Sequence, residues 1–256
     1  MQLPAASIHL LNTYFDNIFV VSVPRFTERH KRVQQHLQGL PFDFFWGADK
    51  LQLDLEEAKQ NGVYDETKTM QLQRQGKPLN AGELACALSH RMVYEQIVKH
   101  NWKRVLVLED DVLPLYENCN ALHAVITELP ENWELVYFGY LKHEEVTVSL
   151  KVKQFFYKIK SALGLMKWTY RMVSNLLPKR YSAHLKKAGF HDCTHAYAIS
   201  LTAAKKLLAA QTPVVYRADD LLSATIMKGV LEAFVTVPKF FDQEAFHDTN
   251  VASEIR

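Results

Sequence analysis

The stretch Arg104-Val-Leu-Val-Leu-Glu-Asp-Asp111 decides the fold class, because an apolar run ends there abruptly in three carboxylates. An unbroken apolar run of this length is typical of a strand buried on both faces, as in a parallel sheet covered by helices. Ligands of open α/β sheets bind outside the carboxyl ends of such strands. The acidic triplet therefore indicates a candidate site at one edge of a layered sheet.

Further apolar runs recur along the chain and alternate with helical patterns. Strands are also predicted at 18–23, 42–46, 135–138, 196–199 and 235–237, and helices at 25–38, 118–129, 200–208 and 218–228. Another helix follows Asn80, which has the spacing of a capping box with Glu83. This alternation predicts an α/β fold with a mostly parallel sheet and helices on both faces. We expect one domain over residues 1–256.

The composition is that of a folded protein without a strong net charge. Lys and Arg number 30 against 28 Asp and Glu, so the net charge of +2 gives no indication of a nucleic-acid partner. Cys86, Cys119 and Cys193 form no C-x-x-C pair, which argues against a zinc ribbon and favours free thiols. The chain shows neither a basic leader nor an apolar run of the ~20 residues that span a bilayer, so we expect a cytoplasmic protein.

Residues 146–191 differ from the rest of the chain because they contain ten basic residues and no acidic one. Within this segment, apolar residues recur at alternating spacings of three and four, which predicts one long amphipathic helix inserted into the domain. They are Phe156, Ile159, Leu163, Met166, Tyr170, Val173 and Leu177. A helix of this kind suits contact with an anionic membrane surface, and its spacing also suits a seam with a second subunit or with the core.

The acidic triplet has two interpretations. In an extended chain Glu109 and Asp111 point to the same side, so they could share one hard divalent cation, which in turn holds a pyrophosphate. Alternatively, one carboxylate caps the next helix and the others are solvated. A phosphatase that uses an Asp-x-Asp pair also places acidic residues after a strand, but Glu109 stands where its nucleophilic aspartate is needed.

A second carboxylate pair, Asp219-Asp220, opens a predicted helix. One of the two could be the N-cap, and the other could act as a general base with a pKa set by burial and nearby charge. Histidines and Cys193 cluster at 191–195 without the spacing of a zinc site, so polar packing is the preferred interpretation. His90 taken alone is interpreted as a histidine on a helix surface.

In combination these motifs resemble glycosyltransferase family 25, the lipopolysaccharide and collagen galactosyltransferase group. The resemblance covers most of the chain, and its most specific part is Gly82-Glu-Leu-Ala-Cys-Ala-Leu-Ser-His90 followed by Val107-Leu-Glu-Asp-Asp-Val112. The other matching segments are 19–25 with Arg29 and Arg32, 42–49, 195–200, 203–208, Asp219 and Ser253-Glu-Ile255. The basic segment 146–191 is longer than the family pattern leads one to expect.

The resemblance implies a GT-A fold and an inverting transfer of a hexose, galactose ahead of glucose, from a UDP-sugar. It implies Mn²⁺ or Mg²⁺ held by Asp111 with Glu109 or Asp110, and a general base at Asp219 or Asp220. Arg25 and Arg32 are implied as contacts of the nucleotide or diphosphate. Ser89, His90 and Asp110 are then expected on the donor side.

The implied acceptor is the lipooligosaccharide core, with inner-core heptose extended on the cytoplasmic face of the inner membrane. The basic segment would then contact the anionic lipid surface, or form a homodimer. A non-catalytic, membrane-associated carbohydrate-binding protein with a degenerate transferase fold is one alternative. A phosphohydrolase is another.

Overall fold

The computed structural model describes residues 2–73 and 75–247, and the segment Ser253–Ile255 lies outside them. The strands are β1 (Asn17–Ser22), β2 (Asp43–Trp46), β3 (Arg104–Glu109), β4 (Val112–Pro114), β5 (Leu135–Leu141), β6 (Lys179–Arg180), β7 (Leu185–Lys187), β8 (Asp192–Ser200), β9 (Ala233–Thr236) and β10 (Phe241–Gln243). The helices are α1 (Ala5–Tyr14), α2 (Thr27–His36), α3 (Leu55–Gln60), α4 (Glu66–Leu72), α5 (Ala81–His100), α6 (Leu122–Glu128), α7 (Val148–Ala162), α8 (Tyr170–Ser174), α9 (Leu201–Ala210) and α10 (Ala218–Met227). All six predicted strands are present, and the capping box of Asn80 with Glu83 forms as predicted.

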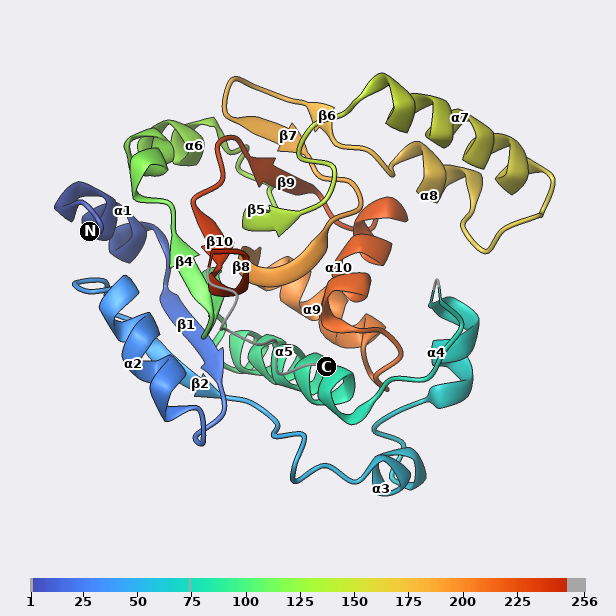
Figure 1. Cartoon of the computed structure of the whole chain (residues 1–256), viewed down its shortest axis with the longest axis horizontal. Helices are drawn as coiled ribbons and strands as arrows, with labels where there is room; N and C mark the ends of the chain where they lie inside the picture. The colour runs from blue at the N-terminus through green and yellow to red at the C-terminus, as the bar shows by residue number, and fades with distance from the viewer. Residues whose placement is uncertain (1, 74, 248–256) are drawn as a thin grey trace.

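The central sheet has eight strands in the order β2-β1-β3-β8-β5-β9-β7-β6 (Figure 1). β1 runs parallel to β2 and β3, and β5 runs parallel to β9. β8, however, is antiparallel to both of its neighbours, β3 and β5, and β7 is antiparallel to β6 and β9. The sheet is therefore mixed and only partly parallel, with three parallel and four antiparallel neighbouring pairs, where a mostly parallel sheet was expected. The long excursion after β5 returns to the edge at which β5 ended, so β8 re-enters the sheet in the opposite direction.

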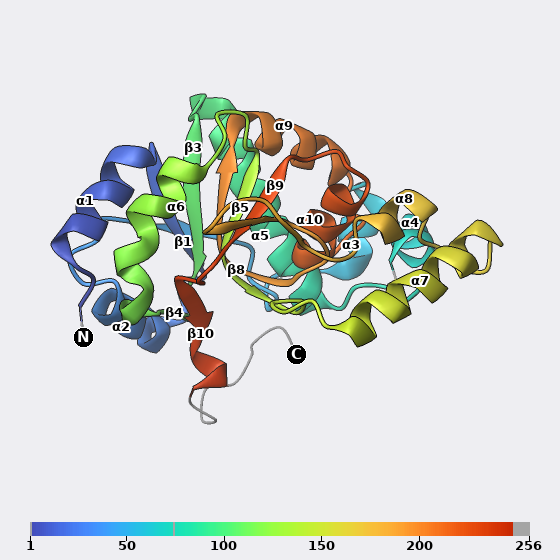
Figure 2. The ribbon, with the colours of Figure 1, turned by 90° about the horizontal axis from the view of Figure 1, so that it is seen from above.

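Helices cover both faces of this sheet, as predicted. α5, α9 and α10 pack on one face, and α1, α2 and α6 on the other (Figure 2). The side chains of β3 alternate between these layers, since Val105 and Val107 belong to the first core cluster and Leu106 and Leu108 to the second. A strand that is apolar on both faces is what this double coverage requires.

The basic segment does not form the single long helix that its spacing predicts. α7 ends at Ala162, and Gly164 follows with a φ of +68°, a conformation that favours glycine and ends a helix. The side chain of Thr169 then accepts a hydrogen bond from the backbone N–H of Met172 and starts the short helix α8. α7 and α8 lie at one end of the molecule, beyond β9 and α10 (Figure 1).

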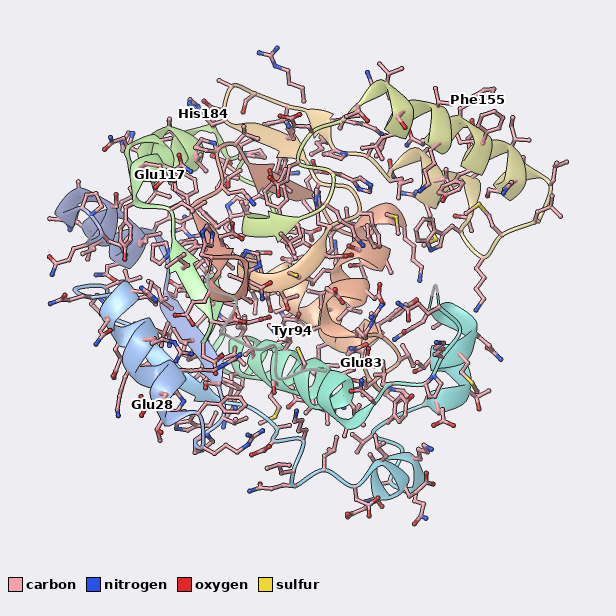
Figure 3. The ribbon with its side chains drawn as sticks, viewed as in Figure 1. Glu28, Glu83, Tyr94, Glu117, Phe155 and His184 are labelled. Atoms are coloured by element: carbon pink, nitrogen blue, oxygen red, sulfur yellow. The ribbon has the colours of Figure 1, made fainter. Side chains whose placement is uncertain are left out.

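α7 also differs from the other helices in its burial. None of its residues is buried, whereas α8 buries Met172 and Val173 against α10 and Phe190. Phe155 on the outer side of α7 is 60% exposed (Figure 3). No helix in the part of the chain described by the structure is long and apolar enough to cross a membrane.

Candidate active site

The carboxyl ends of β1, β2 and β3 meet at one edge of the sheet because these strands are parallel. The antiparallel strand β8 begins at the same edge, so Thr194 lies beside Glu109. A cavity of about 130 Å³ opens there and is called the carboxylate cavity below. Its lining includes Ser22, Arg25, Arg29, Asp49, Cys86, Ser89, His90, Glu109, Asp110, Asp111 and Gln243.

A second cavity of about 130 Å³ adjoins the first and is called the Asp219 cavity below. The two share Cys86, Glu109 and Gln243 in their linings. The Asp219 cavity is also lined by Glu83, Cys193, Thr194, Arg217, Ala218 and Asp219. Glu109 thus lines both cavities, with Asp110 and Asp111 in the first and Asp219 in the second.

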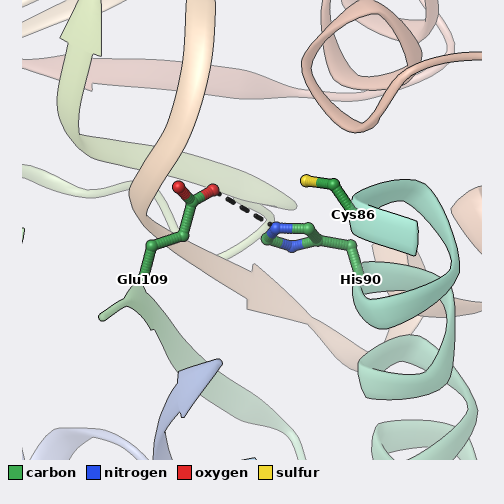
Figure 4. Close-up of side chains that lie close together, drawn as sticks. All are labelled: Cys86, His90 and Glu109. Carbon is green, nitrogen blue, oxygen red and sulfur yellow. Dashed lines mark ion pairs between the residues drawn. The ribbon is translucent and has the colours of Figure 1, made fainter. Parts of the chain in front are cut away.

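Glu109 is anchored from two elements. The Thr194 hydroxyl donates a hydrogen bond of 2.5 Å to its carboxylate, and His90 Nε2 lies 3.3 Å from the same oxygen (Figure 4). Burial opposes ionisation of this carboxyl, but the hydrogen bonds from His90 and Thr194 outweigh it and hold the pKa of Glu109 below its usual value. Glu109 is therefore a fixed carboxylate and not a solvated one.

Asp110 is engaged on both of its oxygens. The Ser22 hydroxyl at the end of β1 donates to Oδ2 and Arg29 of α2 donates to Oδ1, both at 2.5 Å. Burial raises the pKa of Asp110, although Arg29 and Ser22 oppose that rise. The residue ties β1 and α2 to the end of β3, and its oxygens are less available to a ligand than those of its neighbours.

Asp111 is the least satisfied member of the triplet. Gln243 Nε2 lies 3.4 Å from its Oδ2, while its buried Oδ1 has no hydrogen-bond partner among the described residues. Burial, together with the charge of Glu109, raises the pKa of Asp111 to about 7. A buried carboxylate oxygen without a partner is costly unless a cation or a donor reaches it.

Cys86, His90 and Glu109 form a candidate metal site. Their ligand atoms all lie within 4.8 Å of one another, and both α5 side chains face the end of β3 (Figure 4). This group includes Glu109 but not Asp111, so it differs from the predicted pair. Burial and the charge of Glu109 raise the pKa of the Cys86 thiol well above its usual value. A neutral thiol is a poor ligand for hard cations, which prefer oxygen.

His90 is not the surface histidine that its isolated position suggests. It is 1% exposed, and its Nδ1 lies 2.8 Å from the Tyr197 hydroxyl while Nε2 faces Glu109. Its neighbour Ser89 accepts a hydrogen bond from the backbone N–H of Ala48 and donates one to the carbonyl of Ala85. Both residues line the carboxylate cavity, but their polar atoms already hold the protein together there.

The two predicted arginines are placed differently. Arg25 lines the carboxylate cavity and pairs with Asp49 at 2.8 Å. Arg32 does not belong to that lining, and its guanidinium is held 3.0 Å from Glu244. The structure therefore brings Arg25 to the site and leaves Arg32 outside it.

Asp219 and Asp220 lie in the first turn of α10, and neither is its N-cap, because that position is Arg217. Arg217 donates to Asp220 at 2.8 Å and also pairs with Glu83. Asp219 accepts hydrogen bonds from the backbone N–H groups of Asp220 at 2.8 Å and Cys193 at 3.4 Å. Burial and the adjacent charge of Asp220 raise the pKa of Asp219 to about 6. Of the two, Asp219 has the properties of a base near neutral pH.

Several site residues were not predicted from the sequence. Ser22 ends a parallel strand, so its position was inferable, but Thr194 is at the site only because β8 is antiparallel. Gln243 lies at the site because β10 pairs with β4, and no periodicity in the polar tail of the sequence predicts that pairing. His191 and His195 are buried in polar packing, as expected, with contacts to the carbonyls of Lys142 and Phe241.

Comparison with known proteins gives the same family throughout. A "Glycosyltransferase 25 family member" of Anopheles gambiae is 28% identical over 76% of this chain and 29% of its own length. The human "Inactive glycosyltransferase 25 family member 3" is 27% identical over 77% of this chain and 29% of its own. The human "Procollagen galactosyltransferase 2" is 24% identical over 77% and 28% respectively. The chain thus spans less than a third of the length of these curated relatives.

The family match itself is broader than any of these pairwise similarities. Residues 15–222 match the family described as "Glycosyltransferase family 25 (LPS biosynthesis protein)". The matched range includes the acidic triplet, Asp219, Asp220 and every residue of α5 and β8. The chain belongs to glycosyltransferase family 25.

Proposed function

We propose that this protein is an inverting glycosyltransferase of GT-A type that transfers galactose from UDP-galactose to a lipooligosaccharide core. The observation that carries the proposal is the pair of adjoining cavities that meet at Glu109. One contains the acidic triplet, suited to a nucleotide diphosphate, and the other contains Asp219. A displacement with inversion needs the leaving group and the base on opposite sides of the anomeric carbon.

Asp219 is the general base in this proposal. Its carboxylate takes the proton of the acceptor hydroxyl as that oxygen forms its bond to the anomeric carbon and the bond to UDP breaks. The pKa of Asp219 of about 6 leaves it ionised at neutral pH and basic enough to accept a proton. Asp220, held by Arg217, positions the start of α10.

Asp111 and Glu109 would hold the divalent cation, Mn²⁺ or Mg²⁺. They fit such an ion because Asp111 Oδ1 is buried and has no hydrogen-bond partner within residues 2–73 and 75–247, and both groups offer the oxygen ligands that hard cations prefer. When bound, the cation neutralises the charge that develops on the departing diphosphate. Arg25 and Arg29 line the same cavity and add positive charge, while Ser89, His90 and Asp110 shape it.

The proposed donor and the proposed acceptor are supported by different observations. Galactose is favoured over glucose because relatives such as procollagen galactosyltransferase 2 carry that activity in their names. The family description names lipopolysaccharide biosynthesis, which supports the core acceptor and a place at the cytoplasmic face of the inner membrane. The exposed apolar and basic surface of α7 supports peripheral contact with that membrane.

The test is UDP release from a panel of UDP-sugars, with Mn²⁺ and then with EDTA, in the presence and absence of a heptose-containing core acceptor. We expect release that is selective for UDP-galactose, stimulated by acceptor and abolished by EDTA. Some relatives are named inactive, so the contrary result has a clear meaning. A folded protein that binds UDP-galactose but releases no UDP would be a binding protein, and phosphate release from simple esters would indicate a phosphohydrolase.

A further inference from the structure

A cavity of about 490 Å³ is lined by α7, by the loop that joins α7 to α8, and by residues that follow β5 and α8, apart from the carboxylate edge. We call it the lysine cavity. One face of α7 lines it through Leu150, Lys153, Tyr157 and Lys160, which recur at the three-and-four spacing of a helix. Trp168 and Phe190, with ring centroids 5.8 Å apart, contribute aromatic surface.

The charges around this cavity are all of one sign. Lys142, Lys153, Lys160 and Lys167 line it, and no acidic residue does. Lys142 pairs with Asp192, and Lys167 donates to the backbone carbonyl of Met70 at 2.8 Å. Lys153 lies over the ring of Tyr157, and Lys160 has no ion pair with any residue that the structure describes. Ammonium groups around an apolar floor favour a ligand that carries phosphate at one end and apolar groups at the other.

A third cavity of about 230 Å³ adjoins the lysine cavity on the side of α10. The two share Lys167, Trp168 and Phe190 in their linings. The third cavity is also lined by Tyr216 and Asp220, and Asp220 directly follows Asp219. The surface that leads from the lysines therefore reaches the first turn of α10, which also carries the proposed base.

We propose that the lysine cavity binds a phosphate-bearing amphiphile, with its phosphate among the lysines and its apolar part against Trp168 and Phe190. The amphiphile would be the lipid-proximal part of the acceptor. That second statement rests on the proposed function, whereas the binding of the amphiphile does not. The cavity then holds the acceptor at a distance from the reacting hydroxyl, as a subsite separate from the donor site.

The probe is phosphatidic acid with two six-carbon chains, kept below its micellar concentration so that no bilayer is present. Calorimetric titration of the full chain should show saturable binding. Inorganic phosphate carries the phosphate without the apolar chains, and dihexanoylglycerol carries the chains without the phosphate. Each should bind at least about tenfold more weakly than phosphatidic acid. Equal affinity for inorganic phosphate or for dihexanoylglycerol would overturn the amphiphile proposal, because one half alone would then suffice.

Two double variants of α7 test the location. Lys153→Glu with Lys160→Glu reverses two cavity lysines, and we expect at least about a tenfold loss of phosphatidic acid affinity. Lys151→Glu with Lys158→Glu reverses two lysines on the same helix outside the cavity lining and should leave that affinity unchanged. The two variants have the same net charge, so a similar loss in both would show a general charge effect and overturn the assignment. Circular dichroism confirms that each variant is folded.

Assays of UDP release distinguish a failure of the lysine cavity proposal from a failure of the proposed function. For the cavity variant we expect unchanged release of UDP to water and a higher KM for the lipid-linked acceptor. Binding of the probe by a wild-type protein that releases no UDP would overturn the proposed function alone. UDP release by a wild-type protein that does not bind the probe would overturn only the lysine cavity proposal.

Discussion

The Thr194 hydroxyl donates a 2.5 Å hydrogen bond to Glu109, and the two residues belong to strands that run in opposite directions. Because β8 is antiparallel to β3, the start of one strand meets the end of the other. Residues 85 positions apart in the sequence thus share one carboxylate edge. Each of the two adjoining cavities takes part of its lining from this edge.

Asp219 and Asp220 should differ sharply as asparagine variants. Asp219→Asn should lower kcat by about 10²-fold or more, the range for loss of a general base, with little change in the KM for the UDP-sugar. Asp220→Asn removes one partner of Arg217 and the charge that helps to raise the pKa of Asp219, but it leaves the base in place and should cost less than about tenfold. Steady-state kinetics of both variants provides the comparison, and equal losses would contradict the assignment of Asp219 as the base.

The pH dependence of the wild-type enzyme follows from the same carboxylate. Asp219 must be ionised to accept a proton, and its pKa of about 6 lies above the usual aspartate value. Activity should therefore fall as the pH drops below about 6 and level off above it. A pH profile of kcat that is flat between pH 5 and pH 7 would exclude Asp219 as the base.

Cation binding should depend on Asp111 and Glu109 and not on Cys86. Asp111→Asn and Glu109→Gln should each weaken Mn²⁺ binding by at least about tenfold, measured by electron paramagnetic resonance of free Mn²⁺. Cys86→Ser is the control, since a neutral thiol contributes little to a hard cation. Loss of Mn²⁺ affinity in Cys86→Ser would instead place the ion among Cys86, His90 and Glu109.

Because of His191, the free energy of unfolding should decrease at acidic pH. Its side chain is fully buried, and burial lowers its pKa from 6.5 to about 4. The unfolded chain therefore takes up a proton at this residue below pH 6.5, whereas the folded chain does not until about pH 4. The contribution of His191 to the free energy of unfolding is therefore present in full above pH 6.5. It should fall by about 3 kcal/mol as the pH drops to 4.

Urea unfolding at pH 7 and pH 5 measures this effect. His191→Gln should have a smaller pH dependence than the wild type, even though the substitution itself lowers stability at both values. His9→Gln, at an exposed histidine on α1, should keep the wild-type dependence. A wild-type pH dependence in His191→Gln would mean that another group is responsible.

The outer face of α7 should bind anionic vesicles. Val148, Val152, Phe155, Ile159 and Leu163 are all exposed. Phe155→Ser with Ile159→Ser should lower sedimentation with phosphatidylglycerol vesicles by at least about tenfold, because each apolar side chain contributes through its buried area. Leu51→Ser removes a leucine that is 72% exposed elsewhere and should have no effect. Vesicle binding that survives the double change, together with a wild-type dimer that becomes monomeric, would identify this face as a subunit interface.

The six apolar strands β1, β2, β3, β5, β8 and β9 and the helices α2, α5, α6, α9 and α10 were predictable because their signals are local, whereas the remaining, shorter strands and the helices α1, α3 and α4 were not predicted. Apolar runs such as Val105–Leu108 and the capping box at Asn80 determine an element without reference to the rest of the chain. The direction of β8 was not predictable in this way, since periodicity contains no information on which way a strand runs. The break in the basic helix was signalled by Gly164, whose effect outweighs the apolar spacing around it.

The positions of Glu109, Asp111 and Asp219 at the ends of apolar runs were enough to select them as candidates, and the structure places them in the linings of two adjoining cavities. The assignments of Arg32 and His90 depended instead on tertiary contacts. Arg32 is held by Glu244, which lies far along the chain, and His90 is buried against Tyr197. A helical pattern in the sequence does not show which of its polar residues will be buried by another element of the fold.

The long excursion between β5 and β8 begins and ends at paired positions, since Leu141 lies opposite Asp192. The segment therefore departs and returns at one place, and between the two it carries α7 and α8 outward and then adds β6 and β7 to the sheet beside β9. The exposed helix α7 and the loop after it can therefore change in length while β1 and β3 keep their register, because loop length costs little in chain closure. The surface that we propose for the acceptor can then vary while the strand ends that carry Glu109 and Ser22 stay in place.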